Sequence, residues 1–446
     1  MKPTSARSKM KSTLVQPKAF LFGVDWKHQS QVLSIEDSLE ELAVLCRTAG
    51  IEVAGQDFQR MERAHAATLI GSGKVTEIKH WIDETHSEMV IFDEELSPRH
   101  LRELQESLGE ETHVLDRTAL ILDIFAQHAH TREGALQVEL AQYEYRLPRL
   151  TGAWTHLARQ AGGTAGRGGT GGVGLRGPGE TQLEIDRREI SKKIHRLKKE
   201  LDTVRQHRSR YRMRRKGSGQ PVVALVGYTN AGKSTLLNTL AHADIYVADL
   251  LFATLDPTTR QVELPGGKAV LMTDTVGFIQ KLPAALIAAF RATLEEIAEA
   301  DLLLHIVDIS HPNVREHVQS VHQTLQDLGM QNIPIITGIN KIDKLNTPPD
   351  ESFSGEYPNT VFLSAKTGLG IPNLLQTIEN ILYQEMNPIK VKIPYSAGRL
   401  LDLIHREGSV ESVTHKPDGI VITGRIPGAW LSEFRIYLLG ERGAKP

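Results

Sequence analysis

The feature that most constrains the fold is a glycine-rich octapeptide that separates an apolar run from a helical pattern. Its sequence is Gly227-Tyr228-Thr229-Asn230-Ala231-Gly232-Lys233-Ser234. The strand-like run Val222–Val226 precedes it, and helical spacing of apolar residues follows it. This context matches the G-x-x-x-x-G-K-[ST] pattern. Glycines let backbone N–H groups surround a phosphate, and the helix N-terminus adds partial positive charge. The octapeptide therefore predicts a phosphate-binding loop.

Two side chains at the end of this loop have separate expected roles. Lys233 is expected to reach the β- and γ-phosphates and to stabilise charge during phosphoryl transfer. The Ser234 hydroxyl is expected to bind Mg²⁺, which is the cofactor that the sequence predicts. Thr235 begins the helix and is counted among the expected nucleotide contacts.

The identity of the nucleotide base is predicted by a second motif, Asn340-Lys341-Ile342-Asp343, which follows the strand-like run Ile333–Thr337. Guanine presents N1–H and N2–H₂ side by side, so the Asp343 carboxylate can accept from both, whereas adenine lacks this donor pair. Asn340 either bonds the base or ties this segment to the phosphate-binding loop, and the Lys341 stem is expected to pack over the ring. Ser364-Ala365-Lys366 is expected to complete the base pocket through backbone contacts. The predicted substrate is GTP and the product GDP.

Two further segments are expected to contact the γ-phosphate and the metal. Asp274-Thr275-Val276-Gly277 follows the run Ala269–Thr273; we expect the Asp to hold Mg²⁺ through water and the Gly N–H to meet the γ-phosphate. In Phe252-Ala253-Thr254-Leu255-Asp256-Pro257-Thr258-Thr259, one threonine should close over Mg²⁺ and γ-phosphate when GTP binds. We expect Thr254, with Thr258 as the alternative. The expected metal ligands are Ser234, Thr254 and Asp274, and the expected catalytic residues are Lys233, Thr254 and Gly277.

The residue after Gly277 is Phe278, where Ras-like enzymes carry the Gln that orients the attacking water. A phenyl ring can neither donate nor accept a hydrogen bond. One interpretation is slow intrinsic turnover that a bound partner accelerates. The other is that Phe278 packs into the core while water is positioned elsewhere in the protein.

The chain of 446 residues is too long for one ordinary domain, and its texture changes along the sequence. Near-continuous Val, Ile and Leu runs in the nucleotide-binding region predict a mostly parallel sheet with helices on both faces, the α/β class of the P-loop NTPases. We expect a basic tail at 1–18, an N-terminal α/β domain at 19–116, a helical hairpin at 117–217, a G domain at 218–385 and a small C-terminal α+β domain at 386–446.

Particular elements are expected within these segments. The predicted N-terminal strands are Phe20–Val24, Met89–Phe92 and Val114–Leu115, and the predicted helices are Leu39–Ala49 and Leu101–Leu108. One helix is predicted over 117–150, a second from Gly179 to Lys216, and a third near Gly398–Arg406. The predicted G-domain strands are Val222–Val226, Ala269–Thr273, Leu302–Asp308, Ile333–Thr337 and Val361–Leu363.

The second long helix is strongly basic. Between Arg187 and Lys216 the chain has fourteen Lys or Arg residues and three acids. Such a density of like charge favours a polyanion partner such as RNA, although a solvated helix face is the alternative. Residues 162–179 contain ten glycines, which predicts either a close approach to RNA backbone or a flexible linker.

Composition indicates the cellular compartment and argues against a disulfide-bonded, secreted or membrane-spanning protein. Cys46 is the only cysteine, which rules out an intrachain disulfide and favours a reducing compartment. No apolar run is long enough to span a bilayer or to act as a secretory signal, so we expect a cytoplasmic protein without a membrane span. The basic residues 1–18 are interpreted as a tail, with an organelle transit peptide as the alternative. We expect a monomer.

Beyond these residues, the chain resembles the HflX family of translational GTPases over nearly its whole length. The resemblance rests on Gly71-Ser72-Gly73-Lys74, Gly177-Pro178-Gly179-Glu180-Thr181-Gln182-Leu183-Glu184, Gly227–Ser234, Phe252–Arg260, Asp274–Phe278 and Asn340–Asp343. It implies binding to the large ribosomal subunit and its rRNA, with the hairpin reaching toward the peptidyl-transferase region. It also implies splitting or rescue of ribosomes under stress, and ATP binding by the N-terminal part. The local residues at Gly71–Lys74 instead favour a turn, because the phosphate-loop spacing is missing.

The function predicted from the sequence is therefore Mg²⁺-dependent hydrolysis of GTP coupled to ribosome binding. Two alternatives stay open. One is a GTPase of ribosome assembly or RNA modification, and the other is a nucleotide-gated RNA-binding factor whose hydrolysis only resets its affinity.

Overall fold

The computed structural model describes residues 16–27, 33–150, 178–216, 220–241, 251–252, 258–281, 297–345, 355–357, 359–383, 386–427 and 430–439. The chain divides into two compact units, Met1–Gln127 with Gln142–Lys192 and His128–Ala141 with Lys193–Pro446. This division crosses the expected helical segment 117–217, so the five domain boundaries stay a prediction. No helix in the described ranges combines the length and apolar character needed to cross a membrane.

The N-terminal part is built on a four-stranded parallel sheet in the order β2-β1-β3-β4. Its strands are β1 Lys18–Trp26, β2 Glu52–Met61, β3 Met89–Phe92 and β4 His113–Asp116. The helices between them are α1 Ile35–Thr48, α2 Ser72–Thr85 and α3 Pro98–Leu108. Phe20, Phe22 and Phe92 form the centre of a core that includes buried residues of α2 and α3. The three predicted strands and two predicted helices of this region are confirmed within a few residues.

Two N-terminal elements were not predicted. Strand β2 has partly buried and exposed positions but no fully buried one, and it lies at the edge of the sheet, so it lacks the continuous apolar run of a central strand. Helix α2 begins directly after Gly71, where the sequence favoured a turn. Gly71 has an extended conformation as the N-cap, so Ser72, Gly73 and Lys74 form the first turn of a helix. The turn prediction was wrong.

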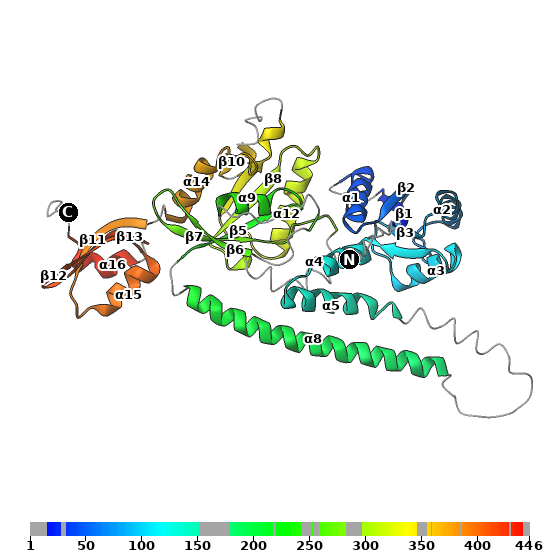
Figure 1. Ribbon diagram of the computed structural model, residues 1–446, viewed down its shortest axis with the longest axis horizontal. Coiled ribbons are helices and arrows are strands. Elements are labelled where there is room, and N and C mark those ends of the chain that lie inside the picture. The colour runs from blue at the N-terminus through cyan, green and yellow to red at the C-terminus, as the bar shows by residue number, and fades with distance from the viewer. Residues whose placement is uncertain are drawn as a thin grey trace, which may run out of the picture. The chain divides into compact units, whose positions relative to one another are not determined.

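The single helix predicted over 117–150 was also wrong, because the structure has two. Helix α4 spans Arg117–His128 and α5 spans Arg132–Arg146. Thr131 caps the start of the second helix, since its side-chain oxygen accepts a hydrogen bond from the Gly134 N–H at 3.0 Å. The predicted basic helix is confirmed as α8, Pro178–Lys216. Figure 1 shows α8 as one uninterrupted helix.

The G domain contains a six-stranded sheet in the order β10-β9-β8-β5-β7-β6. Its strands are β5 Val222–Gly227, β6 Thr258–Glu263, β7 Ala269–Asp274, β8 Leu302–Asp308, β9 Ile335–Asn340 and β10 Thr360–Phe362. All neighbouring pairs are parallel except β6 with β7, which is antiparallel. The mostly parallel sheet was predicted, whereas β6 was not. Its sequence Thr258–Glu263 is mostly polar, as suits an edge strand.

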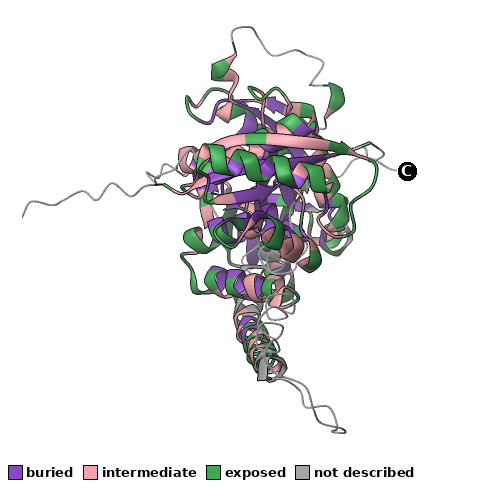
Figure 2. Ribbon diagram, turned by 90° about the vertical axis from the view of Figure 1, so that its right-hand side faces the viewer, coloured by how far each residue is buried: buried purple, intermediate pink, exposed green. Residues whose placement is uncertain are grey.

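Helices cover both faces of this sheet. Helices α9 Lys233–Leu240 and α14 Ile371–Tyr383 share a core with the strands through buried residues such as Leu236 and Leu374. Helix α12, Val314–Asp327, belongs to a second cluster in which Val318 packs with strand residues Val307 and Ile339. For the molecule as a whole, Figure 2 shows buried residues mainly in the interior and exposed residues on the outer sides of the helices. The observed fold class is therefore the predicted one.

The C-terminal part is a three-stranded antiparallel sheet, β11-β13-β12, with helices beside it. The strands are β11 Met386–Ile393, β12 Ser409–Lys416 and β13 Gly419–Pro427. The predicted helix near Gly398–Arg406 is confirmed as α15, Gly398–Glu407, and short helices α16 Leu431–Phe434 and η3 Arg435–Tyr437 follow. Ile404 and Phe434 are fully buried in the core of this part.

Candidate nucleotide-binding site

The sheet order determines where a ligand can bind in the G domain. After β5 the chain forms β6 and β7 on one side of it and then β8 on the other, so β5 lies at the point where the order reverses. Ligands of open α/β sheets bind outside the carboxyl ends of the strands at this point. The phosphate-binding loop leaves the carboxyl end of β5, Asp274 ends β7, and Asn340 ends β9.

Two glycines of the phosphate-binding loop have conformations and surroundings that exclude a side chain. Gly227 has φ 150°, and a Cβ there would lie 2.3 Å from the carbonyl oxygen of Ile306. Gly232 has φ 98°, and its Cβ would lie 2.3 Å from Nδ2 of Asn340. The loop geometry therefore requires glycine at both positions.

Lys233 is held inside this loop. Its Nζ donates to the carbonyl oxygens of Gly227 at 3.1 Å and Tyr228 at 2.9 Å, and only 6% of the residue is exposed. Burial lowers the pKa of Lys233 to about 8, and the negative charge of Asp274 partly opposes this shift. Binding of a phosphate at Nζ would exchange the two carbonyl contacts for a charged partner in a dry environment, where electrostatic attraction is strong.

Ser234 and Asp274 form the pair best suited to hold a metal ion. The Ser234 hydroxyl donates to Oδ2 of Asp274 at 2.6 Å, and Asp274 is 2% exposed. Hydroxyl and carboxylate oxygens are the ligands that Mg²⁺ takes from proteins, and it completes its shell with water and phosphate oxygens. The donor set therefore fits Mg²⁺. Thr258, the alternative threonine, pairs with Asp274 in the β6–β7 ladder.

The segment after Asp274 lies against the phosphate-binding loop. A Cβ on Gly277 would lie 2.9 Å from Cα of Thr229 and 3.0 Å from Nζ of Lys233. The Phe278 N–H donates to the Gly227 carbonyl at 3.1 Å, and the Phe278 carbonyl accepts from the Thr229 N–H at 2.8 Å. The phenyl ring of Phe278 is buried, as the second interpretation of this residue expects, and so cannot orient water.

Asn340 connects the segment expected to bind the base with the phosphate-binding loop. Its Nδ2 donates to the carbonyl of Ala231 at 2.8 Å, and its Oδ1 accepts from the N–H of Ala365 at 2.8 Å. Both contacts are buried. Of the two roles left open by the sequence, the structure thus has Asn340 as the tie between loops. Thr239 of α9 supports the same corner by donating to the Ala365 carbonyl at 2.7 Å.

Lys341 and Asp343 lie on the solvent side of this corner. Lys341 has φ 65°; its Nζ donates to the Asn230 carbonyl at 2.7 Å and pairs with Asp308 at 2.6 Å. Asp343 is exposed and belongs to the short helix η1, Ile342–Lys344. The Ser364 hydroxyl donates to Oδ1 of Asp343 at 2.6 Å, and this hydrogen bond holds the pKa of the Asp343 carboxyl below its usual value. The carboxylate is therefore ionised and oriented.

Most of the predicted residues are brought together at this edge of the sheet. The predicted residues of the ranges 227–235, 274–277, 340–343 and 364–366 lie at or just after the carboxyl ends of β5, β7, β9 and β10, and those from 233 to 235 begin α9. Phe252 is buried with φ 56°, whereas Ala253, Thr254, Leu255 and Asp256 lie outside the described residues. Asp308 and Thr239 were not predicted. Asp308 could have been found, because it ends the predicted strand Leu302–Asp308 beside the others.

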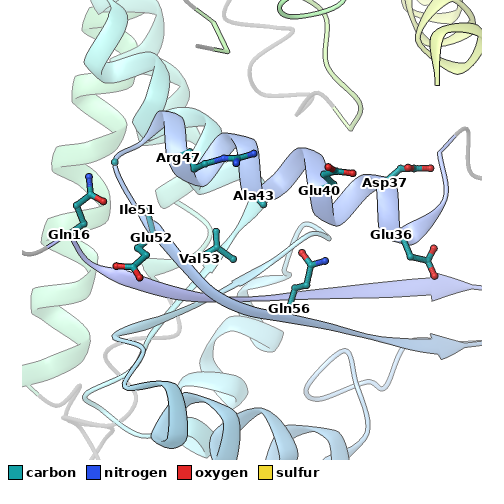
Figure 3. Close-up of a pocket in the computed structure, with 11 residues that line it drawn as sticks. Gln16, Glu36, Asp37, Glu40, Ala43, Arg47, Ile51, Glu52, Val53 and Gln56 are labelled. Atoms are coloured by element: carbon teal, nitrogen blue, oxygen red, sulfur yellow. The ribbon is translucent and has the colours of Figure 1, made fainter. Parts of the chain in front are cut away.

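The N-terminal part offers a different environment. Nζ of Lys74 contacts the carboxylates of Asp57 at 2.8 Å and Glu77 at 2.6 Å. A hollow of about 710 Å³ lies between α1 and β2, and Figure 3 shows its acidic side chains on both elements. These acids are Glu36, Asp37, Glu40 and Glu52, with Arg47 as the cation. Such a lining repels a polyphosphate.

Comparison with known proteins covers the chain in three stretches. Family profiles described as GTP-binding GTPase N-terminal, GTP-binding GTPase Middle Region and 50S ribosome-binding GTPase match residues 36–126, 128–215 and 222–341. A GTP-binding protein from Sulfolobus solfataricus, solved in complex with GDP, aligns at 25% identity and a TM-score of 0.41 over 83% of this chain and 99% of its own.

Curated relatives with the name GTPase HflX match across most of their own length. The relative from Caldanaerobacter subterraneus subsp. tengcongensis is 44% identical over 391 residues, 88% of each chain. The relative from Escherichia coli strain K12 is 41% identical over 387 residues, 86% of this chain and 88% of its own. The phosphate-binding loop lies within the profile match of residues 222–341, which ends inside the segment Asn340–Asp343. The profile and the named relatives together show a GTPase. The chain belongs to the HflX family of GTPases.

Proposed function

We propose that this protein hydrolyses GTP to GDP and phosphate with Mg²⁺, and that it does so on the large ribosomal subunit. The observation that carries the enzymatic part is the Asn340 side chain. It bonds the Ala231 carbonyl and the Ala365 N–H at 2.8 Å each, so the loop that would hold the phosphates and the loops that would hold the base form one unit. A nucleoside triphosphate is the ligand that spans these loops.

The residues would divide the work of the reaction as follows. Lys233 would bind the β- and γ-phosphates, exchanging its present carbonyl contacts for phosphate oxygens. The Gly277 N–H would donate to the γ-phosphate, since Gly277 lies beside Nζ of Lys233. Ser234 and Asp274 would hold Mg²⁺, with Thr254 as a further ligand from outside the described residues and Thr258 as its alternative. Bound Mg²⁺ would neutralise charge on the phosphate oxygens.

Phe278 leaves the positioning of the attacking water to another group, in this protein or in a partner. Its buried ring provides no hydrogen-bonding group at the position that orients water in Ras-like enzymes. We propose slow intrinsic hydrolysis that ribosome binding accelerates, because groups supplied by a partner raise such rates by roughly 10³- to 10⁵-fold.

The ribosomal partner is supported by α8 and by the family profile over residues 222–341, which is described as that of a 50S ribosome-binding GTPase. Between Arg187 and Lys216, helix α8 carries fourteen Lys or Arg residues and three acids, an excess of eleven positive charges. An rRNA surface would neutralise it. Splitting or rescue of ribosomes under stress is the specific role that we propose for this binding.

An ATP site in the N-terminal part is not included in the proposal. The Lys74 ammonium contacts the carboxylates of Asp57 and Glu77. These contacts compete with a phosphate for the same cation.

The base-binding assignment is tested by Asp343→Asn. The carboxylate accepts two hydrogen bonds from guanine, so its loss should weaken GTP binding about a hundred-fold. Xanthosine triphosphate, whose 2-carbonyl pairs with an amide donor, should bind the variant better than GTP. The matched control is Asp327→Asn on α12, an exposed carboxylate that accepts a hydrogen bond from Nε2 of Gln323 at 2.9 Å. The affinities of both variants for GTP and xanthosine triphosphate are measured by fluorescence. An unchanged GTP preference in Asp343→Asn would refute the assignment.

The ribosomal part needs a separate test. We expect the protein to sediment with large subunits in the presence of a non-hydrolysable GTP analogue and to show faster turnover with them. Replacing Arg208, Arg212 and Arg215 with Gln should reduce the salt dependence of binding by roughly one unit of slope for each lost phosphate contact. Unchanged affinity and slope would exclude α8 as the electrostatic contact. Turnover unaffected by subunits would favour the nucleotide-gated binding factor instead.

A further inference from the structure

One residue of the phosphate-binding loop contacts three different elements of the G domain. The Tyr228 hydroxyl accepts a hydrogen bond from the Gln280 N–H at 2.8 Å. The Tyr228 ring stacks on the ring of His317 in α12, with centroids 3.8 Å apart and an interplanar angle of 8°. Its carbonyl accepts from Nζ of Lys233 at 2.9 Å. We propose that Tyr228 is a positioning residue for GTP hydrolysis, which holds the segment Gly277–Gln280 against the phosphate-binding loop.

The surroundings of Tyr228 make these contacts firm. Tyr228 is 6% exposed and Gln280 is 9% exposed, so water competes little for the hydroxyl or for the amide. The hydroxyl is the group that satisfies the Gln280 N–H, and a buried N–H without a partner is costly. The stack with His317 fixes the plane of the ring, and the ring plane in turn fixes where the hydroxyl lies.

The position of the contact gives it a role in the reaction. Phe278 is tied to the loop through its own N–H and carbonyl, and Gln280 is tied two residues later through the Tyr228 hydroxyl. These two ties follow directly after Gly277, whose N–H is proposed to meet the γ-phosphate. With the tie at Gln280 removed, the segment after Gly277 would lose one of these two ties, and the productive position of the Gly277 N–H would be occupied for a smaller fraction of time.

The inference rests on the proposed function, since it assumes that Gly277 acts on the γ-phosphate. Its failure can be distinguished from failure of the proposed function, because it predicts a change in hydrolysis rate without a change in GDP affinity. Binding of GDP depends on the loop amides, Lys233 and the base-binding residues, none of which loses a contact when only the hydroxyl of Tyr228 is removed. Tyr228 should therefore affect the hydrolysis rate and leave GDP affinity unchanged.

The variant Tyr228→Phe removes the hydroxyl and keeps the ring on His317. Under single-turnover conditions with excess full-length protein, we expect the maximal hydrolysis rate to fall about ten-fold, as for a lost hydrogen bond to a buried donor. The protein concentration for half-maximal rate and the GDP affinity should stay within about two-fold, a change of under half a kcal/mol. The matched control is Tyr383→Phe in α14, a buried tyrosine of the same domain whose ring contacts Lys268, and it should retain the wild-type rate.

A second pair of variants tests the ring contact. His317→Phe keeps an aromatic plane beside Tyr228, whereas His317→Ala removes it. We expect His317→Ala to lower the maximal rate and His317→Phe to restore most of it, again without change in GDP affinity. A merely structural role would lower the thermal midpoint and both nucleotide affinities together in Tyr228→Phe and His317→Ala.

The outcomes separate clearly. A ten-fold slower rate with unchanged GDP affinity in Tyr228→Phe, together with rescue by His317→Phe, supports the proposal. A wild-type rate in Tyr228→Phe, or a parallel loss of rate and GDP affinity, overturns it. Failure of the proposed function would be seen differently, as wild-type protein that prefers no guanine nucleotide or hydrolyses none.

Discussion

The Ser234 hydroxyl donates a hydrogen bond to Oδ2 of Asp274 at 2.6 Å, which joins the first turn of α9 to the end of β7. The two residues lie forty positions apart in the chain, and each was predicted to hold Mg²⁺ from a different motif. Their direct contact means that one cation can reach both oxygens after a small separation of the pair. A shared metal is therefore a geometric consequence of the parallel sheet, whose strand ends meet at one edge.

Ser234→Ala tests this pair. Removing the hydroxyl should weaken Mg²⁺-dependent GTP binding about ten-fold, while binding in EDTA should change little. Ser234→Thr is the matched control, because it keeps the hydroxyl at the same position of the pattern. Titration of Mg²⁺ against labelled GTP measures the effect. A Mg²⁺ dependence in Ser234→Ala equal to that of the wild type would remove Ser234 from the metal site.

The position of the nucleotide-binding loops could be predicted from the sequence, because the glycine pattern of these motifs reflects backbone geometry. The side-chain contacts within the site could not. Gly227 and Gly232 are required by close approaches to Ile306 and Asn340, so the glycine pattern and the fold imply each other. The burial of Phe278 and the bond from Gln280 to Tyr228 depend instead on side chains that meet only after folding. The spacing of residues along the sequence does not predict such contacts.

The elements that were wrongly predicted or missed also depend on features that residue spacing does not show. Strand β2 and strand β6 are edge strands with polar sequences, and hydrophobic periodicity does not mark an element that buries little. The break between α4 and α5 includes a side-chain cap at Thr131, in a stretch whose apolar spacing continues on both sides. Buried strands such as β5 and β8 were located within one residue, because both faces of the sheet are covered.

Gly277→Ala should separate catalysis from binding. The added methyl group would lie 2.8 Å from Cγ2 of Thr229, 2.9 Å from its Cα and 3.0 Å from Nζ of Lys233. The backbone must shift, which moves the N–H away from the γ-phosphate and should lower the single-turnover rate about a hundred-fold. The matched control is Gly355→Ala, where a Cβ would meet nothing within 4 Å. GDP binding should be preserved in both variants. A normal rate in Gly277→Ala would show that the amide is not used.

Arg117→Ala should destabilise the N-terminal part specifically. The guanidinium is 2% exposed; its NH1 lies 2.7 Å from Oδ1 of Asp93, which is fully buried, and its NH2 bonds Glu41. Its removal leaves buried negative charge without the cation, which costs about 3–5 kcal/mol of unfolding free energy. Arg102→Ala, on an exposed part of α3, should cost at most about 1 kcal/mol. Urea unfolding followed by tryptophan fluorescence, with Trp26 and Trp81 in this part, measures the difference. Equal midpoints for the two variants would contradict the prediction.

His305→Leu should change how the stability of the G domain depends on pH. His305 lies in the centre of β8 and is 1% exposed, its Nδ1 has no hydrogen-bond partner, and the ring of His322 lies 5.4 Å away. Burial, with smaller contributions from His322 and Lys233, lowers the pKa of His305 to about 3. The unfolded chain has a histidine pKa of about 6.5, so it binds more protons than the folded protein at pH values between these two limits.

Because protons favour the unfolded chain in that window, stability should be fully present above the unfolded pKa and should fall as the pH is lowered through it toward the folded value. For His305 alone, the loss between pH 7.5 and pH 5.5 is about 1.4 kcal/mol. His305→Leu should reduce the wild-type pH difference by this amount, whereas His311→Leu, at an exposed position of the same domain, should leave it as in the wild type. Urea unfolding followed by circular dichroism at the two pH values measures it. Equal losses of stability on acidification in His305→Leu and in the wild type would contradict the prediction. They would mean that the His305 ring can take up a proton in the folded protein.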